Sequence, residues 1–354
     1  MPQKPINLGI YHLPVGVSIV IPCHNAARRL PDTLANLACQ QVPPAIPWEV
    51  VVVDNASTDD TSSIALAAWP KSLSVPLRVV HEPRLGAAPA RSRGLTEAAY
   101  EFVSVVDDDN WVCTDWIATV AEVMSQHPEV GVCGSLSRAV CEGPVPLWFD
   151  QFNSAYAIGA WGEEPGDVTQ KRAALWSAGL TIRKTAWEQL QQKGFQPLLA
   201  GRKKKDLTCG DDSEICYALR LSGWRWWYEP RLRFQHYLPA SRLNWQYLRR
   251  LHRGFGASSI VLDLYAEALK SELLPASGRW IKNAWAREVY YVTRRLTEFG
   301  FKLIHAWFSP CEGNADVLTI ENQYGRWRAL MRMRVSYPAI AASVHNAPWR
   351  NSKR

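Results

Sequence analysis

The chain has 354 residues, of which 47% are hydrophobic, enough for one large domain or two with a packed core. It holds no run of about 18 uninterrupted apolar residues, so we expect no membrane-spanning helix. The net charge of +7 is uneven, because from residue 240 onward 18 Lys and Arg stand against 8 Asp and Glu.

The N-terminal segment 1–14 carries prolines where a signal peptide has an apolar run, so we expect a cytoplasmic protein. Eight cysteines occur, none of them in a CxxC pair and none spaced with histidine as in a zinc finger. Free thiols in a reducing compartment are the expected state.

The first part of the chain alternates strand and helix patterns. Apolar, β-branched runs predict buried strands at 17–22, 48–55, 77–82 and 102–107. Helical spacing or helix-start signals follow these strands at 30–41, at 57–69, from 86 and at 114–127. Continuous apolar strands separated by helices predict an α/β fold with a parallel sheet covered on both faces. Ligands of such sheets bind beyond the carboxyl ends of the strands.

Three consecutive aspartates end the fourth predicted strand, in VSVVDDDNW. Strand alternation predicts that Asp107 and Asp109 point the same way. Two neighbouring carboxylates need a partner cation to stay ionised, and Mg²⁺ or Mn²⁺ bridging to a diphosphate would supply it. The alternative is a solvated acidic turn.

The later chain is less regular and then helical. We expect a strand or turn followed by a helix over 175–190, a helix opened by acids over 210–224, and two short strands over 224–237 around a turn at Glu229–Pro230. Helices are predicted over 244–256, 279–308 with a break at Gly300, and 314–334.

Seven segments in one order resemble the family 2 glycosyltransferases with the GT-A fold. They are SIVIPCHNAARRLPDTL, VVVDNASTDDT, EPRLGAAPARSRGL, VVDDDN, SAGLTIRK, GDDSEICYALRLSGW and FQHY, spread between Val17 and Tyr237. The stretch GDDSEICYALRLSGWRWWYEP is also similar to enzymes that build bacterial surface polysaccharides. The resemblance implies a GT-A catalytic domain over 1–239, with a Rossmann-like nucleotide-binding mixed sheet flanked by helices. A helical, basic, Trp-rich region over 240–354 would serve acceptor, membrane-surface or oligomer contacts.

The same resemblance implies an inverting, metal-dependent transfer of a sugar from a UDP- or dTDP-sugar to a hydroxyl of a glycan or lipid-linked glycan, with GDP-sugars also open. The cation would stabilise the leaving diphosphate while a base deprotonates the acceptor. One alternative is a nucleotidyltransferase that forms sugar nucleotides, although 23–30 lacks its glycine- and lysine-rich loop. The other is a sugar-nucleotide-binding protein without catalysis.

The resemblance implies roles for the acids of the DDD run. Asp109 would be the direct metal ligand, and Asp107 would contact ribose or the metal through water. Asp108 would bind nucleotide or only shape the turn. His236, in FQHY, would complete the metal site, the alternative being an ordinary histidine at a strand end.

Further residues match the family's donor site. Asp54 would hold the nucleotide base, although Asp and Asn are also good helix caps. The rest of the expected donor site comprises Pro22, His24, Asn25 and Arg91, with Ala178 and Gly179 letting the sugar approach the backbone. Trp176 would stack on a sugar or belong to the core.

Asp212 matches the catalytic base, with Asp211 and Glu214 as the other candidates. The alternative for all three is compensation of the helix dipole. Just before them, the basic run Lys203–Lys205 would close over phosphates, meet lipid headgroups or simply be solvated.

The tail holds six tryptophans among its basic residues. This mixture suits an anionic membrane surface, as well as a solvated helical domain. No nucleic-acid motif is visible, and oligomeric state stays open. We therefore expect a cytoplasmic enzyme, peripheral on the inner face of the membrane if the tail binds lipid.

Overall fold

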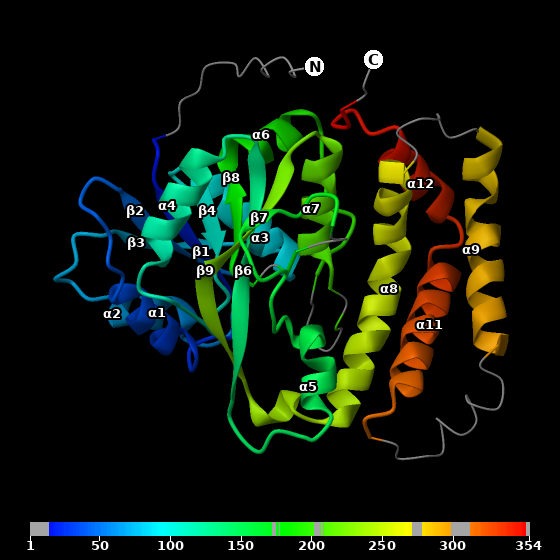
Figure 1. Cartoon of the computed structure of the whole chain (residues 1–354), viewed down its shortest axis with the longest axis horizontal. Helices are drawn as coiled ribbons and strands as arrows, with labels where there is room; N and C mark the ends of the chain where they lie inside the picture. The colour runs from blue at the N-terminus through cyan, green and yellow to red at the C-terminus, as the bar shows by residue number, and fades with distance from the viewer. Residues whose placement is uncertain are drawn as a thin grey trace.

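The computed structural model describes residues 14–171, 175–176, 178–201, 207, 209–270, 278–298 and 312–351, with side chains of α9 from residue 284. The predicted basic run Lys203–Lys205 lies outside the described residues, and so does the part of the predicted helix 279–308 that follows residue 298. The described chain forms an α/β body with a layer of long helices beside it (Figure 1).

A nine-stranded mixed sheet with the order β3-β2-β1-β4-β8-β6-β9-β5 forms the centre, and β7 pairs with β9 off this path. The strands are β1 (Val17–Cys23), β2 (Trp48–Asp54), β3 (Leu77–His81), β4 (Phe102–Val105), β5 (Asn110–Val112), β6 (Val130–Cys141), β7 (Gly166–Asp167), β8 (Leu180–Arg183) and β9 (Arg225–Leu238). The helices are α1 (Leu30–Ala38), α2 (Thr61–Ala68), α3 (Ala87–Glu97), α4 (Trp116–Gln126), α5 (Phe149–Phe152), α6 (Lys184–Gln192), α7 (Asp211–Leu221), α8 (Trp245–Lys270), α9 (Gly278–Glu298), α11 (Ala315–Arg332) and α12 (Tyr337–His345).

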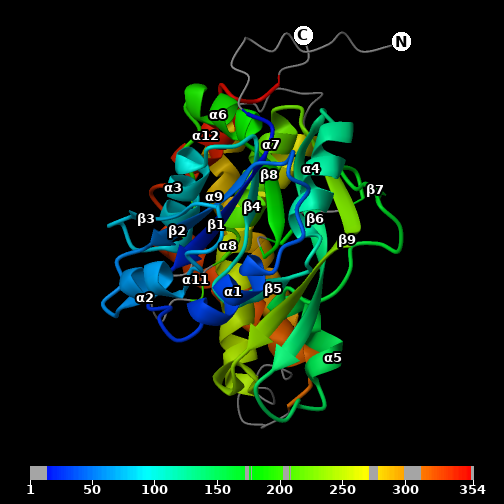
Figure 2. The same ribbon diagram turned by 90° about the vertical axis from the view of Figure 1, so that its left-hand side faces the viewer.

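The first four strands pair in parallel, as predicted. The apolar runs of β1, β2 and β4 are buried on both faces, whereas β3, at the edge of the sheet, is half-buried. Burial of this kind contributes about 25 cal/mol per Å² of apolar surface. The alternation of β1 sends Ile19 and Ile21 into a cluster with α1, α2 and α4. Val20 instead joins a cluster with α3, α6, α7 and α8 on the opposite face. Figures 1 and 2 show these helices on the two sides of the sheet.

The sheet is mixed rather than wholly parallel, because β8 runs antiparallel to both β4 and β6. The prediction of two short strands around Glu229–Pro230 was wrong, since β9 is one strand of 14 residues. The register between β6 and β9 shifts where Gly134 faces Tyr228 and Leu136 faces Arg233. The predicted turn is thus a bulge within β9, where a proline costs no ladder hydrogen bond.

The C-terminal helices pack on the α/β body through α8. Ile260, Leu264 and Tyr265 of α8 lie in the same hydrophobic cluster as Ile215 of α7. The predicted helix over 244–256 therefore extends to Lys270, because its apolar face continues beyond the two glycines of RGFG. The described core is continuous across residue 239.

Helices α8 and α11 touch backbone to backbone. A Cβ on Gly256 would lie 1.9 Å from the carbonyl oxygen of Asn322, and one on Gly325 would lie 2.0 Å from that of Arg253. Glu321 of α11 accepts hydrogen bonds from Arg249 and Arg253 of α8 at 2.9 Å and 2.8 Å. The two helices are thus held in one register.

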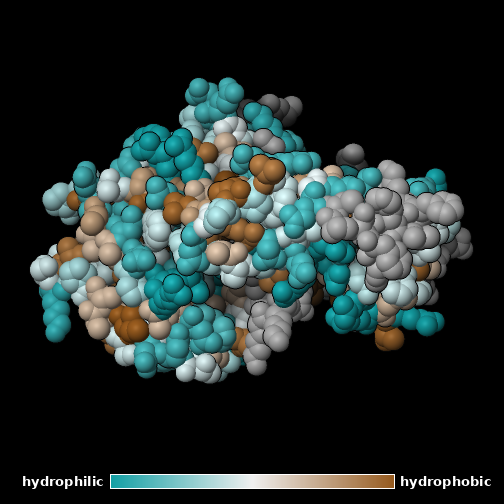
Figure 3. All heavy atoms as spheres, turned by 90° about the horizontal axis from the view of Figure 1, so that it is seen from below, coloured by the Kyte–Doolittle hydropathy of each residue, from teal (hydrophilic) through white to brown (hydrophobic). Residues whose placement is uncertain are grey.

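Among the described helices, none combines the length and the hydrophobicity needed to cross a bilayer. On the face seen in Figure 3, hydrophobic residues form small groups between hydrophilic ones. The seven described cysteines are all free.

Candidate active site

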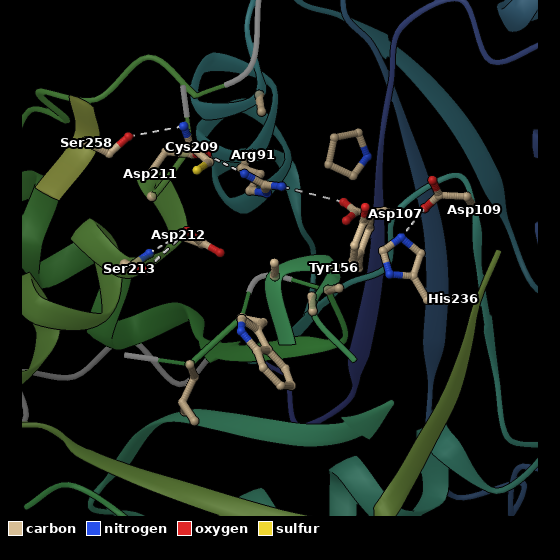
Figure 4. Close-up of a pocket in the computed structure, with 18 of the residues that line it drawn as sticks. Arg91, Asp107, Asp109, Tyr156, Cys209, Asp211, Asp212, Ser213, His236 and Ser258 are labelled. Carbon is tan, nitrogen blue, oxygen red and sulfur yellow. Dashed lines mark hydrogen bonds and ion pairs between the residues drawn. The ribbon is translucent and has the colours of Figure 1, made fainter. Parts of the chain in front are cut away.

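A cavity of about 790 Å³ opens beyond the carboxyl ends of β1 and β4. Its lining joins parts of the chain that are distant in sequence: the end of β1, the turn after β4, α3, the start of α7, the end of β9, and α8. Figure 4 shows Arg91 pointing toward Asp107, Asp109 beside His236, and the carboxylate of Asp212 reaching into the space between these groups.

The three aspartates leave the sheet before they reach the cavity. Strand β4 ends at Val105, so Asp107–Asp109 lie in a turn and the expected strand alternation does not apply. All three nevertheless line the cavity. The turn is fixed because Thr33 Oγ1 donates a 2.9 Å hydrogen bond to the carbonyl oxygen of Asp108.

The carboxylate of Asp108 is engaged by Arg29. The guanidinium donates hydrogen bonds of 3.2 Å and 2.9 Å to its two oxygens, a bidentate pairing. Burial and the neighbouring Asp109 raise the pKa of Asp108 to about 6 in spite of this pairing. Asp108 thus contributes to the shape of the turn, one of the two roles expected for it.

Asp109 faces two different partners. His236 Nε2 lies 3.6 Å from its Oδ1, and Arg242 Nη1 donates a 3.0 Å hydrogen bond to its Oδ2. The pairing of β5 with β9 brings them together, since Asn110 is opposite His236 in the register. The expected partnership of Asp109 with His236 is therefore present in the geometry.

Arg91 joins the two acidic motifs. Its guanidinium forms an ion pair with Asp211 and lies 3.6 Å from Asp107 Oδ1. Burial lowers the pKa of Arg91, but Asp211 and Asp107 outweigh it and the net shift is upward. Burial is also the main reason that the pKa of Asp211 is raised. Asp211 therefore acts as the anchor of Arg91.

The three candidate bases differ in what they contact. Asp212 lines the cavity, and its Oδ1 accepts a 2.7 Å hydrogen bond from the backbone N–H of Ser213. Glu214 is fully buried and accepts 2.8 Å hydrogen bonds from the backbone N–H groups of Leu198 and Leu199. Tyr265 Oη donates a further 2.7 Å hydrogen bond to Glu214. Glu214 thus holds a loop, whereas Asp211 and Asp212 line the cavity, Asp211 in an ion pair with Arg91.

Of the residues that follow β1 and β2, some line the cavity and others form hydrogen bonds within the loops around it. Pro22 and His24 line the cavity, as expected, and His24 Nδ1 lies 2.8 Å from the carbonyl oxygen of Asn55. Asn25 lies outside the lining and accepts a 2.8 Å hydrogen bond from the backbone N–H of Thr58.

Asp54 is likewise outside the cavity lining. It accepts hydrogen bonds from Ser57 N at 3.0 Å and Ser62 Oγ at 2.5 Å. Burial opposes ionisation of Asp54, but these hydrogen bonds outweigh it and lower the pKa. Its neighbour Asn55 is the residue of this loop that lines the cavity.

Ala178 lines the cavity, whereas Gly179 does not. Gly179 has φ +65°, and a Cβ there would lie 2.5 Å from Ser135 Oγ and 2.9 Å from the ring of Phe234. The glycine is therefore required by the packing behind the cavity rather than by room for a ligand.

The sequence patterns do not predict that Arg242 and residues of α8 line the cavity. Phe255, Ser258 and Leu262 of α8 line the cavity together with Tyr247. The only local signal was the position of Arg242, six residues after His236. The contact itself depends on the packing of the tail, which no local pattern reports.

Asp109 and His236 suit a cation that is bound partly by the protein and partly by the phosphates of a ligand. Among the described residues, no group of three or more His, Cys, Asp or Glu side chains is arranged to hold a metal alone. Mg²⁺-type ions, however, are often bound by one or two protein groups plus substrate phosphates. A carboxylate oxygen and an imidazole nitrogen facing each other, Asp109 and His236, fit that chemistry.

A family model described as glycosyl transferase family 2 matches residues 18–205. The poly(ribitol-phosphate) β-N-acetylglucosaminyltransferase TarS of Staphylococcus aureus is 29% identical over 31% of this chain and 19% of its own. The putative teichuronic acid biosynthesis glycosyltransferase TuaG of Bacillus subtilis is 36% identical over 27% of this chain and 36% of its own. The succinoglycan biosynthesis protein ExoM of Rhizobium meliloti is 27% identical over 43% and 48%. The matches thus span less than half the length of each of these curated relatives.

Solved structures share the fold. The mannosyltransferase PcManGT of Pyrobaculum calidifontis, in complex with GDP-Man and Mn²⁺, superposes with a TM-score of 0.50 at 19% identity over 97% of this chain and 91% of its own. GalNAc-T7, with UDP, GalNAc and Mn²⁺, gives a TM-score of 0.51 at 15% identity over 94% of this chain and 58% of its own. The mixed sheet with flanking helices is therefore of the GT-A type, as expected.

Proposed function

This chain belongs to the family 2 glycosyltransferases, and on that premise we propose that it transfers a sugar from a nucleotide-sugar donor to a hydroxyl group of a glycan or lipid-linked glycan, with inversion at the anomeric carbon. One observation carries the proposal. Acids from two motifs about a hundred residues apart, Asp107–Asp109 and Asp211–Asp212, line a single cavity at the carboxyl ends of parallel strands.

The donor would occupy the end of the cavity near Pro22, His24 and Arg91. Asp109 and His236 would hold a divalent cation together with diphosphate oxygens, and Asp107 would support it through water. Such a cation stabilises negative charge on a departing diphosphate. Arg242 and Arg91 add fixed positive charge on the same side, which also favours a phosphate-bearing ligand.

Asp212 would act as the general base. Its carboxylate takes the proton of the acceptor hydroxyl as that oxygen forms a bond to the anomeric carbon. The bond from the anomeric carbon to the diphosphate oxygen breaks with its electron pair on the diphosphate. Arg91 holds Asp211 in place beside it, so one acid is committed to structure and the other is directed to the acceptor.

The C-terminal helices support a further contact with an anionic membrane surface. Tyr290 and Tyr291 of α9 are 61% and 51% exposed, and the exposed Arg294 and Arg295 follow one turn later. Aromatic and basic side chains on one helix suit the interface of an anionic leaflet.

The experiment that tests the function is a screen of UDP-, dTDP- and GDP-sugars for release of the nucleoside diphosphate, with Mg²⁺ and Mn²⁺ varied. We expect turnover with a subset of donors and a requirement for a divalent cation. Titration with UDP, with and without Mn²⁺, is the companion measurement. Nucleotide binding without turnover toward any donor would instead identify a protein that binds sugar nucleotides without catalysis.

A further inference from the structure

A groove of about 360 Å³ lies at the β5 edge of the sheet, apart from the cavity of the candidate active site. It is lined by residues of β5, β6 and β9, by Asn36 of α1 and by Thr114, which follows β5. Figure 2 shows β5 beside α1, with β6 and β9 next to them. Among the described residues, none lines both hollows. The groove and the cavity therefore present different side chains.

The register of three neighbouring strands places the side chains of the groove on one face of the sheet. Gln235 of β9 is opposite Trp111 of β5 on one side and opposite Arg138 of β6 on the other. Arg233 lies two residues earlier on β9, so its side chain shares this face. His236, the residue after Gln235, lines the cavity instead. Alternate side chains of β9 thus serve the two hollows.

The charge of the groove is positive. Arg138 and Arg233 are exposed, and neither forms an ion pair within the part of the chain that the structure describes. They lie diagonally across adjacent strands, since Arg138 is opposite Gln235 and Arg233 is opposite Leu136. None of the described residues that line the groove is acidic. Like charges on one face of a sheet are destabilising, and a bound anion removes that cost.

A tryptophan and three uncharged polar side chains complete the groove. Trp111 is half-buried, and its ring packs against Tyr237 with centroids 5.8 Å apart and planes inclined by 34°. Gln235, Asn36 and Thr114 also line the groove, and their side chains carry amide and hydroxyl groups. A pyranose has C–H groups on its flat faces and hydroxyls at its edge. An aromatic ring beside hydrogen-bonding groups matches both features.

We propose that this groove binds an acidic sugar unit of a polysaccharide, with the sugar ring on Trp111 and its carboxylate or phosphate between Arg138 and Arg233. A guanidinium group matches both anions through paired hydrogen bonds. A polysaccharide strand can enter a groove, whereas a flat lipid surface cannot. The inference goes beyond the proposed function, because it concerns a binding site outside the cavity and requires no turnover.

The test is calorimetric titration with tetragalacturonate, which carries carboxylates, with pentamannose 6-phosphate, and with neutral mannopentaose. We expect at least one acidic probe to bind more tightly than mannopentaose, and its affinity to fall with added salt. Arg138→Gln together with Arg233→Gln should weaken this binding about tenfold or more. Trp111→Ala should weaken it about threefold or more, and Trp111→Phe should restore part of the affinity.

Helix α11 offers matched controls. Arg328 and Arg332 are exposed arginines one turn apart, and Trp327 is 37% exposed. Arg328→Gln together with Arg332→Gln, and separately Trp327→Ala, should bind the acidic probe as wild type does. Titration with UDP is a further control, since groove variants should keep the wild-type affinity for the nucleotide. Wild-type protein that binds no nucleotide overturns the proposed function, while the saccharide titrations still test the groove.

The two acidic probes also identify the anion. A preference for tetragalacturonate supports a uronate ligand, and a preference for the phosphorylated probe supports a sugar phosphate. Equal affinity for mannopentaose and both acidic probes overturns the proposal, as does equal affinity in wild type and the double arginine variant. Wild-type protein that binds none of the saccharides, but binds phosphatidylglycerol vesicles through the same two arginines, overturns it by assigning the groove to lipid.

Discussion

Arg91 of α3 forms an ion pair with Asp211 at the start of α7, a residue 120 positions later in the chain. The same guanidinium lies 3.6 Å from Asp107. Both partners of the ion pair are buried. A single arginine thus contacts both acidic motifs, Asp107–Asp109 and Asp211–Asp212.

Removing Arg91 should be costly to folding. In Arg91→Met the buried Asp211 carboxylate loses its partner, and such losses destabilise proteins by about 3–5 kcal/mol. In the double variant Arg91→Met/Asp211→Leu the unpaired buried carboxylate is also removed, so most of the lost free energy of unfolding should be recovered. Denaturant unfolding of the two variants measures both effects. A loss under about 1 kcal/mol in Arg91→Met would contradict the role assigned to this pair.

Asp212→Asn should fold normally and lose activity. Removal of a general base typically lowers the rate about 10²–10⁴-fold, so turnover should fall by that factor while UDP affinity stays near wild type. The control is Asp316→Asn, at an acid in the first turn of α11, which should cost only about 0.3–1 kcal/mol of stability. Near-full turnover in Asp212→Asn would remove this residue from the mechanism.

Metal-dependent nucleotide binding should depend on Asp109 and His236. Asp109→Asn and His236→Asn should each lower UDP affinity at least about tenfold in Mn²⁺, to the level of wild type in a chelator. Asp59→Asn, at an acid outside the cavity lining, is the control. The measurement is calorimetric titration. Unchanged Mn²⁺ dependence in both variants would mean that the cation binds elsewhere.

The carboxyl group of Glu214 should make stability depend on pH. Burial raises its pKa from about 4.5 to about 7, although hydrogen bonds from Tyr265 and the loop favour ionisation. Between these two pH values Glu214 is protonated in the folded state but ionised in the unfolded state. The contribution of this protonation to the free energy of unfolding is therefore full below pH 4.5 and lost as pH rises through about 7. The stability of wild type relative to Glu214→Gln should fall by up to about 3 kcal/mol between pH 4.5 and pH 8. Glu163→Gln, at an exposed glutamate, should show no such trend.

Membrane binding should be electrostatic. Arg294→Gln together with Arg295→Gln should weaken binding to phosphatidylglycerol vesicles, since each basic residue near an anionic surface contributes about 1 kcal/mol. The control replaces Lys71 and Lys193 of the catalytic body. Vesicle co-sedimentation at physiological salt is the measurement. Wild-type protein that ignores these vesicles would refute the membrane contact.

The strands that the sequence predicts well are those with uninterrupted apolar runs. The predictions for β1 to β4 agree with the structure to within two residues. Strands β1, β2 and β4 are buried on both faces and therefore need such runs, and the half-buried edge strand β3 shares the pattern. Strand β6 was not predicted, because its glycines and serines interrupt the apolar pattern of a buried strand. Gly131 lies against Trp224 and Gly134 against Leu175, so neighbours fill the space that its own side chains leave.

The site divides in the same way. Short motifs in the sequence predict cavity-lining residues such as Asp109, Asp212 and His236. Partners brought by distant packing were not. Arg29 reaches Asp108 across 79 positions, and Phe255 reaches the cavity only because α8 docks on Cys209 and Gly210.

The contact of Gly256 with α11 limits how the α8 wall of the cavity can change. The face of α8 opposite the cavity is held against α11 at Gly256 of α8 and Gly325 of α11, where an added methyl group would collide with the backbone of the other helix. Transplanting the tail of another transferase would thus tilt or lift the helix unless both glycines came with it. The shape of this cavity wall can therefore be altered mainly by exchanging side chains on the inner face of α8, one at a time, while the backbones of both helices stay in place.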